Sequence, residues 1–268
     1  MYLYIIIVAI IILYFIILKI NKHMIYKPYI PFEDEYNNMI EKHNMENTEN
    51  IMITNGDEKY INILWLNKNN ENIVIYVHGN SGWIGSVIES TAIKSLLEHS
   101  SVAVFDYSGY GISDGNPSEG QTYKDLDLVI KYFVDIKKIS PTNIIIYGFS
   151  LGTSIASKLV AENKEHKFKA LILEAPFISI KDVAYEMNPL LKYLSITNYN
   201  NYNNLKKIKE NDNTIDITII HSKSDEIINF SHGKKLSDEF KCPLLEIKGS
   251  HNEPLYENIL KEIFSKYK

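Results

Sequence analysis

The residues that could act together in covalent chemistry begin with a serine in a glycine-flanked turn. Ser150 lies in the motif Gly148-Phe149-Ser150-Leu151-Gly152, directly after the β-branched run at residues 143–147. From the motif onward, apolar residues recur at helical spacing: Leu151, Ile155, Leu159 and Val160. A strand that turns sharply into a helix exposes the central serine, which predicts that Ser150 is a nucleophile. A Gly-Ser loop without a chemical role is the alternative that the motif alone leaves open.

An aspartate and a histidine follow in the second half of the chain. Asp225 comes after the predicted strand at residues 215–221, and His251 comes after the predicted strand at residues 243–247. An imidazole can accept the proton of a serine hydroxyl, and a carboxylate can fix the tautomer of that imidazole and stabilise its cation. The order and the strand-end positions therefore predict a catalytic triad of Ser150, Asp225 and His251.

A glycine-rich turn after residues 72–77 is the candidate for stabilising negative charge. It reads His78-Gly79-Asn80-Ser81-Gly82. The tetrahedral intermediate of acyl transfer needs two aimed N–H donors. We expect the backbone amides of Asn80 and Leu151 to supply them, with Gly79 allowing close approach of the substrate.

Two further acidic residues have other expected roles. Asp106 opens the glycine- and tyrosine-rich segment 106–113, and we expect it to fix this loop through backbone hydrogen bonds. Glu226, the neighbour of Asp225, is the alternative acid of the triad.

Strand-like runs alternate with helical stretches along the chain. An antiparallel pair at residues 51–54 and 60–66, joined by a tight turn at Asn55-Gly56, would begin the sheet. Residues 121–139 are a predicted helix with one apolar face: Leu126, Ile130, Phe133 and Ile136. Further strands are expected at residues 101–105 and 170–174. The pattern predicts an α/β protein of the α/β-hydrolase fold, with a mostly parallel central sheet flanked by helices.

A long excursion separates two of the predicted strands. Residues 175–213 carry few strand signals, and we interpret them as a small cap over the site; a surface excursion with one helix is the alternative. Four apolar cap residues are expected to bind substrate: Met187, Leu190, Leu191 and Tyr193.

Composition excludes several classes of function. The chain has 268 residues, 45% of them hydrophobic, and a net charge of −5, so nothing indicates a nucleic-acid partner. The single cysteine, Cys242, excludes an intrachain disulfide, and no Cys/His spacing indicates a zinc site.

The first residues predict a membrane anchor. Residues 1–18 are uninterruptedly apolar, about long enough for a thin bilayer, and we expect residues 1–20 to form a single transmembrane helix. A cleaved signal peptide is disfavoured because no basic segment precedes the run and no cleavage site follows it. Lys19, Lys22 and Lys27 follow the run, which predicts a cytosolic catalytic domain. Residues 21–48 would form a connector, and residues 49–268 the α/β-hydrolase domain.

Several motifs together resemble one branch of a known superfamily. They are His78-Gly79-Asn80, Asp106-Tyr107-Ser108-Gly109-Tyr110-Gly111 with Pro117-Ser118-Glu119, Tyr147-Gly148-Phe149-Ser150-Leu151-Gly152-Thr153, Ser224-Asp225-Glu226 with Phe230-Ser231-His232-Gly233, and His251-Asn252. In these the chain is similar to the membrane-associated α/β-hydrolases that include the protein depalmitoylases. The resemblance implies Ser150 as nucleophile, Asp225 as acid and His251 as base, a fatty-acyl thioester or ester as substrate, and no metal or organic cofactor. Those depalmitoylases attach through an amino-terminal cluster of modified cysteines, which this chain lacks.

The sequence therefore predicts a membrane-anchored serine hydrolase acting on acylated protein or lipid through an acyl-enzyme. A lipase or monoacylglycerol-type carboxylesterase is one alternative. A catalytically silent membrane-anchored scaffold is another, although an intact triad and oxyanion loop argue against it. A peptidase using the same triad is disfavoured because the chain has no large substrate-gating domain.

Overall fold

The computed structural model describes residues 2–43, 47–54, 59–66, 70–194, 197–211 and 214–267. Within these residues, one sheet has the strand order β11-β10-β9-β8-β7-β4-β6-β3-β2. Its strands are β2 (Thr48–Thr54), β3 (Tyr60–Leu66), β4 (Ile73–Val77), β6 (Ser101–Phe105), β7 (Ile144–Phe149), β8 (Ala170–Glu174), β9 (Asp216–Ser222), β10 (Leu244–Gly249) and β11 (Pro254–Leu255). The six central strands, in the order β10-β9-β8-β7-β4-β6, pair in parallel. The outer strands β2, β3 and β11 are antiparallel to their neighbours. The predicted mostly parallel sheet with an antiparallel start is confirmed; the turn predicted at Asn55-Gly56 lies outside the described residues.

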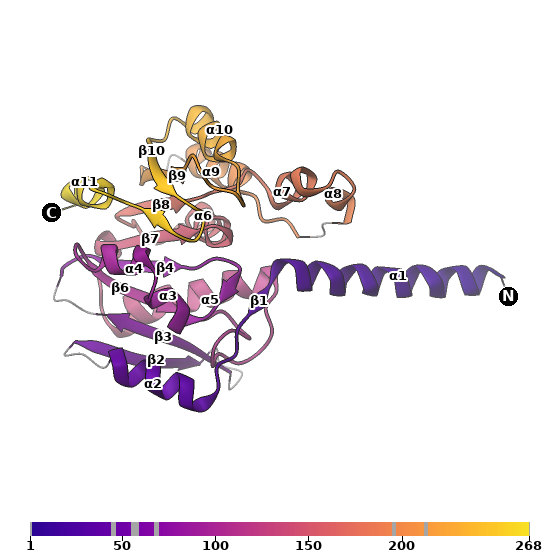
Figure 1. The fold of residues 1–268 in the computed structure, drawn as a ribbon, viewed down its shortest axis with the longest axis horizontal. Helices are drawn as coiled ribbons and strands as arrows, with labels where there is room; N and C mark the ends of the chain where they lie inside the picture. Colours follow the sequence, from indigo (N-terminus) through magenta and orange to yellow (C-terminus); the bar gives the residue numbers. More distant parts are fainter. Residues whose placement is uncertain are drawn as a thin grey trace.

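Helices cover both faces of this sheet (Figure 1). One face packs against α5 (Glu119–Lys131), α6 (Leu151–Glu162), α9 (Asn201–Glu210) and α10 (Phe230–Phe240). The other packs against α2 (Glu33–His43), α3 (Ile84–Ile88), α4 (Thr91–Leu96) and α11 (Ile259–Ser265). Side chains alternate between the two cores along a strand: Ile73, Ile75 and Val77 face one, and Val74 and Tyr76 the other.

The predicted helix at residues 121–139 is only partly correct. Helix α5 ends at Lys131 and continues as a π-helical turn over Tyr132–Ile136. A π-helical turn holds more residues than an α-helical one, so it rotates the apolar face. Leu126, Ile130 and Phe133 are buried as predicted, but Ile136 is 68% exposed, and its assignment to the buried face was wrong.

The described residues of the excursion between β8 and β9 form three helices. Helices α7 (Ile180–Met187) and α8 (Leu191–Leu194) lie at the open side of the molecule near the inner end of α1 (Tyr2–Ile25), as Figure 1 shows. Helix α9 instead packs on α6 and buries Leu205 and Ile208 in the main core. Only the part of the predicted cap that contains α7 and α8 therefore stands over the site.

The amino-terminal helix projects away from the body of the molecule (Figure 1). It continues to Ile25, and α2 lies within the stretch interpreted as a connector. Among the residues whose structure is described, no helix meets the combined length and apolar character needed to cross a membrane. After α1, β1 (Lys27–Pro28) pairs in parallel with β5 (Ser81–Gly82), which brings the end of α1 beside the turn that follows β4.

Candidate active site

Ser150 occupies the sharp turn between β7 and α6. Its backbone has φ 52° and ψ −117°, a strained region for a residue other than glycine. The two flanking glycines make the turn sterically feasible: a Cβ on Gly148 would lie 2.6 Å from the Gly152 carbonyl oxygen, and one on Gly152 would collide with the Val77 carbonyl. The Ser150 amide donates to the Glu174 carbonyl at 2.9 Å, which ties the turn to the neighbouring strand β8.

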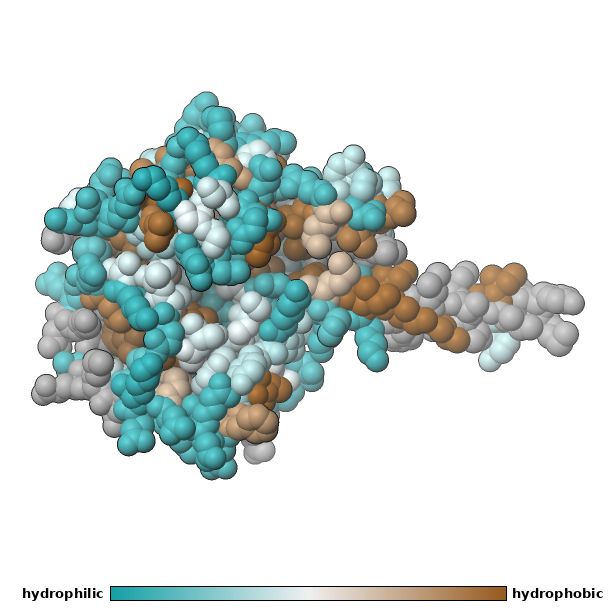
Figure 2. All heavy atoms as spheres, viewed as in Figure 1, coloured by the Kyte–Doolittle hydropathy of each residue, from teal (hydrophilic) through white to brown (hydrophobic). Residues whose placement is uncertain are grey.

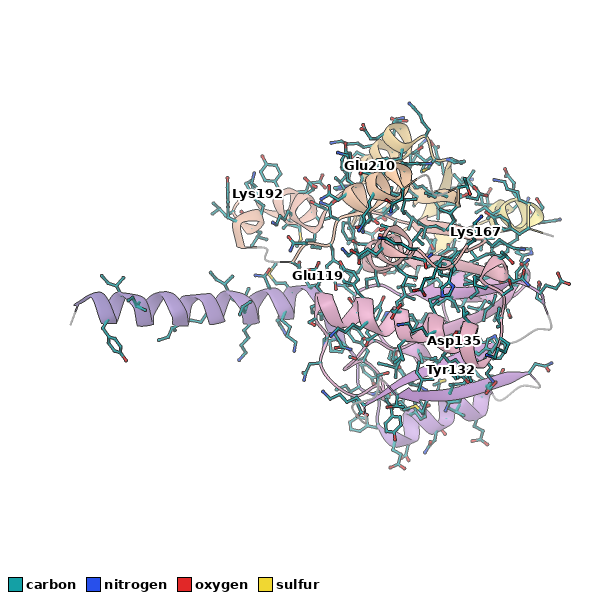
Figure 3. All side chains as sticks on the ribbon, turned by 180° about the vertical axis from the view of Figure 1, so that it is seen from behind. Glu119, Tyr132, Asp135, Lys167, Lys192 and Glu210 are labelled. Carbon is teal, nitrogen blue, oxygen red and sulfur yellow. The ribbon has the colours of Figure 1, made fainter. Side chains whose placement is uncertain are left out.

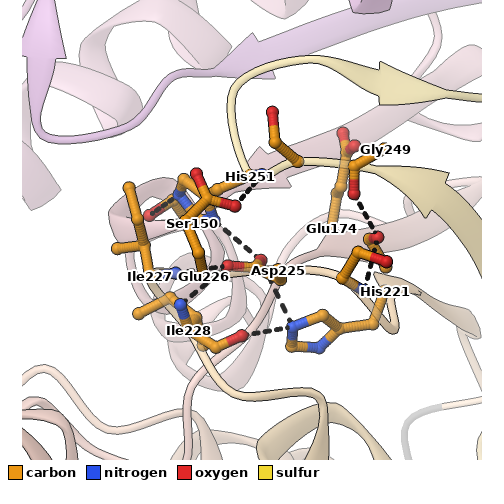
Figure 4. A network of polar contacts seen from close by, with 12 residues as sticks. Ser150, Glu174, His221, Asp225, Glu226, Ile227, Ile228, Gly249 and His251 are labelled. Atoms are coloured by element: carbon orange, nitrogen blue, oxygen red, sulfur yellow. Dashed lines mark hydrogen bonds and ion pairs between the residues drawn. The ribbon is translucent and has the colours of Figure 1, made fainter.

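Three side chains from different strand ends form one row of hydrogen bonds (Figure 4). His251 Nε2 lies 3.1 Å from Ser150 Oγ, and His251 Nδ1 lies 2.7 Å from Asp225 Oδ2. Ser150 and His251 are buried, and the side chain of Asp225 is only 1% exposed. With Nδ1–H donating to the carboxylate, Nε2 is left to accept the serine proton. The structure thus brings the three predicted triad residues together in the required order.

The Asp225 carboxylate is held by its own loop. Its Oδ1 accepts from the amides of Ile227 at 2.9 Å and Ile228 at 2.8 Å. Burial by itself raises the pKa of Asp225, but the interactions with His221 and His251 and the Ile228 amide outweigh burial and hold the pKa below its usual value. The carboxylate is therefore ionised at neutral pH, as orienting the imidazole of His251 requires.

His221 supports the same loop, and the sequence reasoning missed it. Its Nε2 donates to the Ile228 carbonyl at 3.0 Å and lies 3.5 Å from Asp225 Oδ2. The signal was a histidine directly after the apolar pair Ile219-Ile220 in a predicted strand, where a buried polar side chain needs a partner. A Cβ on Gly233 would collide with the His221 ring, so this position requires glycine.

Glu226 has a different place from that of a triad acid. Its Oε2 accepts from the backbone amide of His251 at 3.1 Å, so it holds the main chain of the histidine rather than its ring. Asp225, which contacts the ring, is the acid that the geometry selects over Glu226.

Glu174 closes the underside of the site, and it too was missed. Besides the carbonyl that binds the Ser150 amide, its carboxylate accepts from the hydroxyls of Tyr147 and Tyr256, both at 2.7 Å. Burial raises the pKa of Glu174 despite these two hydrogen bonds. Glu174 is the only charged residue of an otherwise apolar strand, and this was the only sign in the sequence of a special role for it.

The glycine turn after β4 lies against the serine. A Cβ on Gly79 would be 3.6 Å from the Cβ of Ser150, and both Asn80 and Leu151 line the cavity that Ser150 faces. The Asn80 carbonyl accepts from the Lys27 amide at 2.9 Å and from the Tyr110 hydroxyl at 2.7 Å. These bonds hold the peptide unit between Asn80 and Ser81 in place. They thereby restrict the orientation of the adjoining backbone N–H of Asn80, which is the predicted oxyanion donor.

Asp106 does not contact the triad. Its Oδ1 accepts from the Ile84 amide at 2.7 Å, so it bonds to backbone as predicted, although it holds the start of α3 rather than its own loop. The loop is held instead by Asp125, which accepts from the Ser108 amide at 2.7 Å and the Ser108 hydroxyl at 2.9 Å. Burial raises the pKa of Asp106 to about 8, against the lowering effect of the Ile84 amide.

A cavity of about 750 Å³ opens above Ser150 and His251. Of the four predicted substrate-binding residues, Met187 and Leu191 line it. Leu190 and Tyr193 do not; they are 71% and 76% exposed, and the prediction for these two was wrong because the chain turns between α7 and α8. The sequence reasoning missed other lining residues, among them Ile180, Val183 and Ala184 from α7, and Asn21, Met24 and Ile25 from α1. The α7 residues recur at i, i+3, i+4 and i+7 with Met187, a helical pattern that could have revealed them.

Comparison with known proteins agrees with this fold. The family model described as the alpha/beta hydrolase fold matches residues 72–194. The chain is 29% identical over 229 residues to uncharacterized protein R595 of Acanthamoeba polyphaga mimivirus, covering 78% of this chain and 77% of that protein. It is also 29% identical over 170 residues to the human alpha/beta hydrolase domain-containing protein 17C, covering 63% of this chain and about half (48%) of that protein.

Two solved structures share the architecture. An alpha-beta hydrolase from Vibrio vulnificus aligns with a TM-score of 0.71 at 18% identity, over 96% of this chain and 92% of that one. The Pyrococcus furiosus esterase Pf2001 aligns with a TM-score of 0.65 at 18% identity, over 90% and 96% of the two chains. The chain has the α/β-hydrolase fold, and the geometry of its site is that of a serine hydrolase.

Proposed function

We propose that the protein is a membrane-anchored serine hydrolase that cleaves fatty-acyl thioesters or esters through an acyl-enzyme on Ser150. One observation carries the proposal: the unbroken row from Ser150 Oγ through His251 to Asp225 opens onto a largely apolar cavity. A serine alone is a weak nucleophile, and this row is what activates it.

The reaction has two halves. In the first, His251 Nε2 takes the proton of Ser150 while Oγ attacks the acyl carbonyl, and the oxyanion that forms meets the amides of Asn80 and Leu151. The proton passes from His251 to the departing thiol or alcohol, leaving the acyl group on Ser150. In the second, His251 takes a proton from water, the hydroxide attacks the acyl-serine, and the same proton returns to Ser150 as the fatty acid leaves.

The lining of the cavity supports an acyl chain as the bound group. Apolar side chains from α7 face the triad, and the charged side chain of Lys27 is the only Lys, Asp or Glu among the described lining residues. The resemblance to the branch that includes the depalmitoylases favours a thioester of an acylated protein. An oxygen ester of a lipid is the second candidate, because the same cavity would hold its acyl chain.

Membrane anchoring rests on the sequence of the first residues and on what surrounds them. Residues 1–18 contain no charged side chain. Apolar residues also gather where the inner end of α1 meets the body of the molecule (Figure 2), and the exposed Met24 and Met187 both line the cavity there. A lipid surface would cover these residues and deliver acyl chains at high local concentration.

A hydrolysis panel tests the proposal. The full-length protein in detergent micelles is given palmitoyl-thioester peptide, monoacylglycerol and short p-nitrophenyl esters, with fluorophosphonate labelling of Ser150 as a substrate-independent measure of nucleophilicity. We expect labelling and turnover of the long-chain thioester. Labelling with turnover of monoacylglycerol alone would replace the thioester by an oxygen ester. Absence of labelling in folded protein would remove the enzyme function and leave an anchored scaffold.

A further inference from the structure

The amino-terminal helix contributes to the wall of the substrate cavity. Asn21, Met24 and Ile25, in the last turns of α1, line the same space as Ser150. Asn21 and Ile25 are buried, while Met24 is partly open to the surface. A helix that served only to attach the domain to a membrane would not need to end inside its cavity.

The end of α1 is held in a fixed place by the residues that follow it. Tyr26 is buried and its hydroxyl lies 2.8 Å from that of Tyr199, which in turn lies 2.9 Å from the Thr122 hydroxyl on α5. Next to this row, Glu119 accepts from the Asn198 amide at 2.8 Å; Figure 3 shows Glu119 beside the inner end of α1. The row of hydroxyls from Tyr26 through Tyr199 to Thr122 therefore connects the end of α1 with the chain that follows the cap helices and with α5.

The opposite wall is the inner face of α7. Ile180, Val183, Ala184 and Met187 line the cavity and recur at helical spacing. An eight-residue helix is about 12 Å long, so its inner face is long enough to contact several methylenes of an extended chain. The α7 wall is apolar, whereas Asn21, Ser86 and Ser90 add polar groups elsewhere in the lining. A ligand with a reactive carbonyl at the triad and an apolar tail along α7 therefore fits this space.

We propose that the last turns of α1 and the inner face of α7 together form the groove that binds the acyl chain, and that Met24 and Val183 determine which chain lengths are accepted. This inference rests on the proposed function, since it assigns the selectivity of that same site. Each methylene buried between these walls contributes about 0.8 kcal/mol, or up to roughly fourfold in kcat/KM, before the cost of ordering it.

The test compares p-nitrophenyl esters from acetyl to hexadecanoyl in detergent micelles. Filling the groove with Met24→Trp or Val183→Trp is expected to lower the ratio of dodecanoyl to acetyl kcat/KM at least tenfold, whereas Met24→Ala should move the optimum to longer chains. Ile20→Trp is the matched control: Ile20 lies one turn earlier on α1, is 45% exposed and is not among the lining residues, so the length profile should stay that of the wild type.

The outcomes separate the two proposals. If the wild type neither labels with fluorophosphonate nor hydrolyses any ester, the proposed function fails. If the wild type is active but Met24→Trp, Val183→Trp and Met24→Ala all keep its length profile, the groove assignment alone is overturned. A change caused by Ile20→Trp as large as that caused by Met24→Trp would also overturn it, because the effect would then come from the helix and not from the cavity wall.

Discussion

The hydroxyl of Ser150 is the group on which the chemistry depends. Replacing it by hydrogen in Ser150→Ala leaves the cavity and the amides of Asn80 and Leu151 in place but removes the nucleophile. We expect kcat/KM for a p-nitrophenyl ester to fall by about 10³-fold or more, equivalent to roughly 4 kcal/mol of lost transition-state stabilisation. Ser154→Ala, one turn further along the chain on α6 and also buried, is the control and should retain activity. A folded Ser150→Ala protein with a tenth of the wild-type rate would exclude Ser150 as the nucleophile.

The adjacent carboxylates of Asp225 and Glu226 bind different parts of His251, the ring and the backbone amide, so their variants should differ in activity. Asp225→Asn replaces the acceptor of the His251 Nδ1 proton by an amide that can favour the wrong tautomer, and we expect a loss of about 10³-fold or more. Glu226→Gln keeps an oxygen that can accept from the His251 amide, so its loss should stay below about tenfold. Measured kcat values for the two variants decide between them; a larger loss for Glu226→Gln would make Glu226 the acid.

Asp106 is a buried acid with a consequence for stability. Its pKa is about 8 in the folded protein and about 3.9 in an unfolded chain, so between these values the folded state holds a proton that the unfolded state has released. Stability from this group is complete below about pH 4 and is lost as pH rises toward 8. Asp106→Asn has no such proton and keeps an oxygen for the Ile84 amide.

The measurement for Asp106 is the pH dependence of the melting temperature. The Tm of Asp106→Asn minus that of the wild type should increase between pH 5 and pH 8, whatever the constant offset from burying an amide. Asp238→Asn, which removes an exposed carboxylate on α10, should show no such increase. A flat difference for Asp106→Asn would mean that Asp106 is ionised throughout this range in the folded protein.

At the scale of elements, β1 links the amino-terminal helix to the oxyanion loop. The Lys27 amide donates to the Asn80 carbonyl, and this bond requires only the backbone. Lys27→Pro removes the N–H, whereas Lys27→Ala keeps it. We expect acetyl-ester kcat to fall about tenfold in Lys27→Pro and to change little in Lys27→Ala. Equal activities of the two variants would show that β1 does not position Asn80.

The elements and the triad were predictable because each depended on local pattern. Buried parallel strands are apolar runs, and β6 and β8 were predicted to the residue; Ser150, Asp225 and His251 followed from their positions at strand ends. The substrate cavity was predicted only in part, because a wall made by α1 and α7 depends on how distant segments pack. The sequence distance between Met24 and Val183 carries no signal of their shared cavity.

At the scale of the whole molecule, one side of the hydrolase combines the cavity, the cap helices and the projecting α1 (Figure 1). An apolar helix on the same side as the cavity mouth would hold the site at a fixed distance from a bilayer. If residues 1–20 are the attachment, their deletion should release the protein from membranes in a carbonate wash. Full-length protein that washes off equally well would show that the helix is not the anchor.

For a membrane-anchored protein, the charges beside the anchor predict the orientation. Lys19, Lys22 and Lys27 lie just after the apolar run and favour the cytosolic side, so the hydrolase domain should face the cytosol. In intact microsomes with the amino terminus in the lumen, added protease should therefore digest the domain without detergent, while a lumenal marker stays protected. The Asn229-Phe230-Ser231 sequon gives a second readout, because glycosylation occurs only on the lumenal side. A protected domain carrying a glycan at Asn229 would reverse the orientation and direct the cavity toward lumenal substrates.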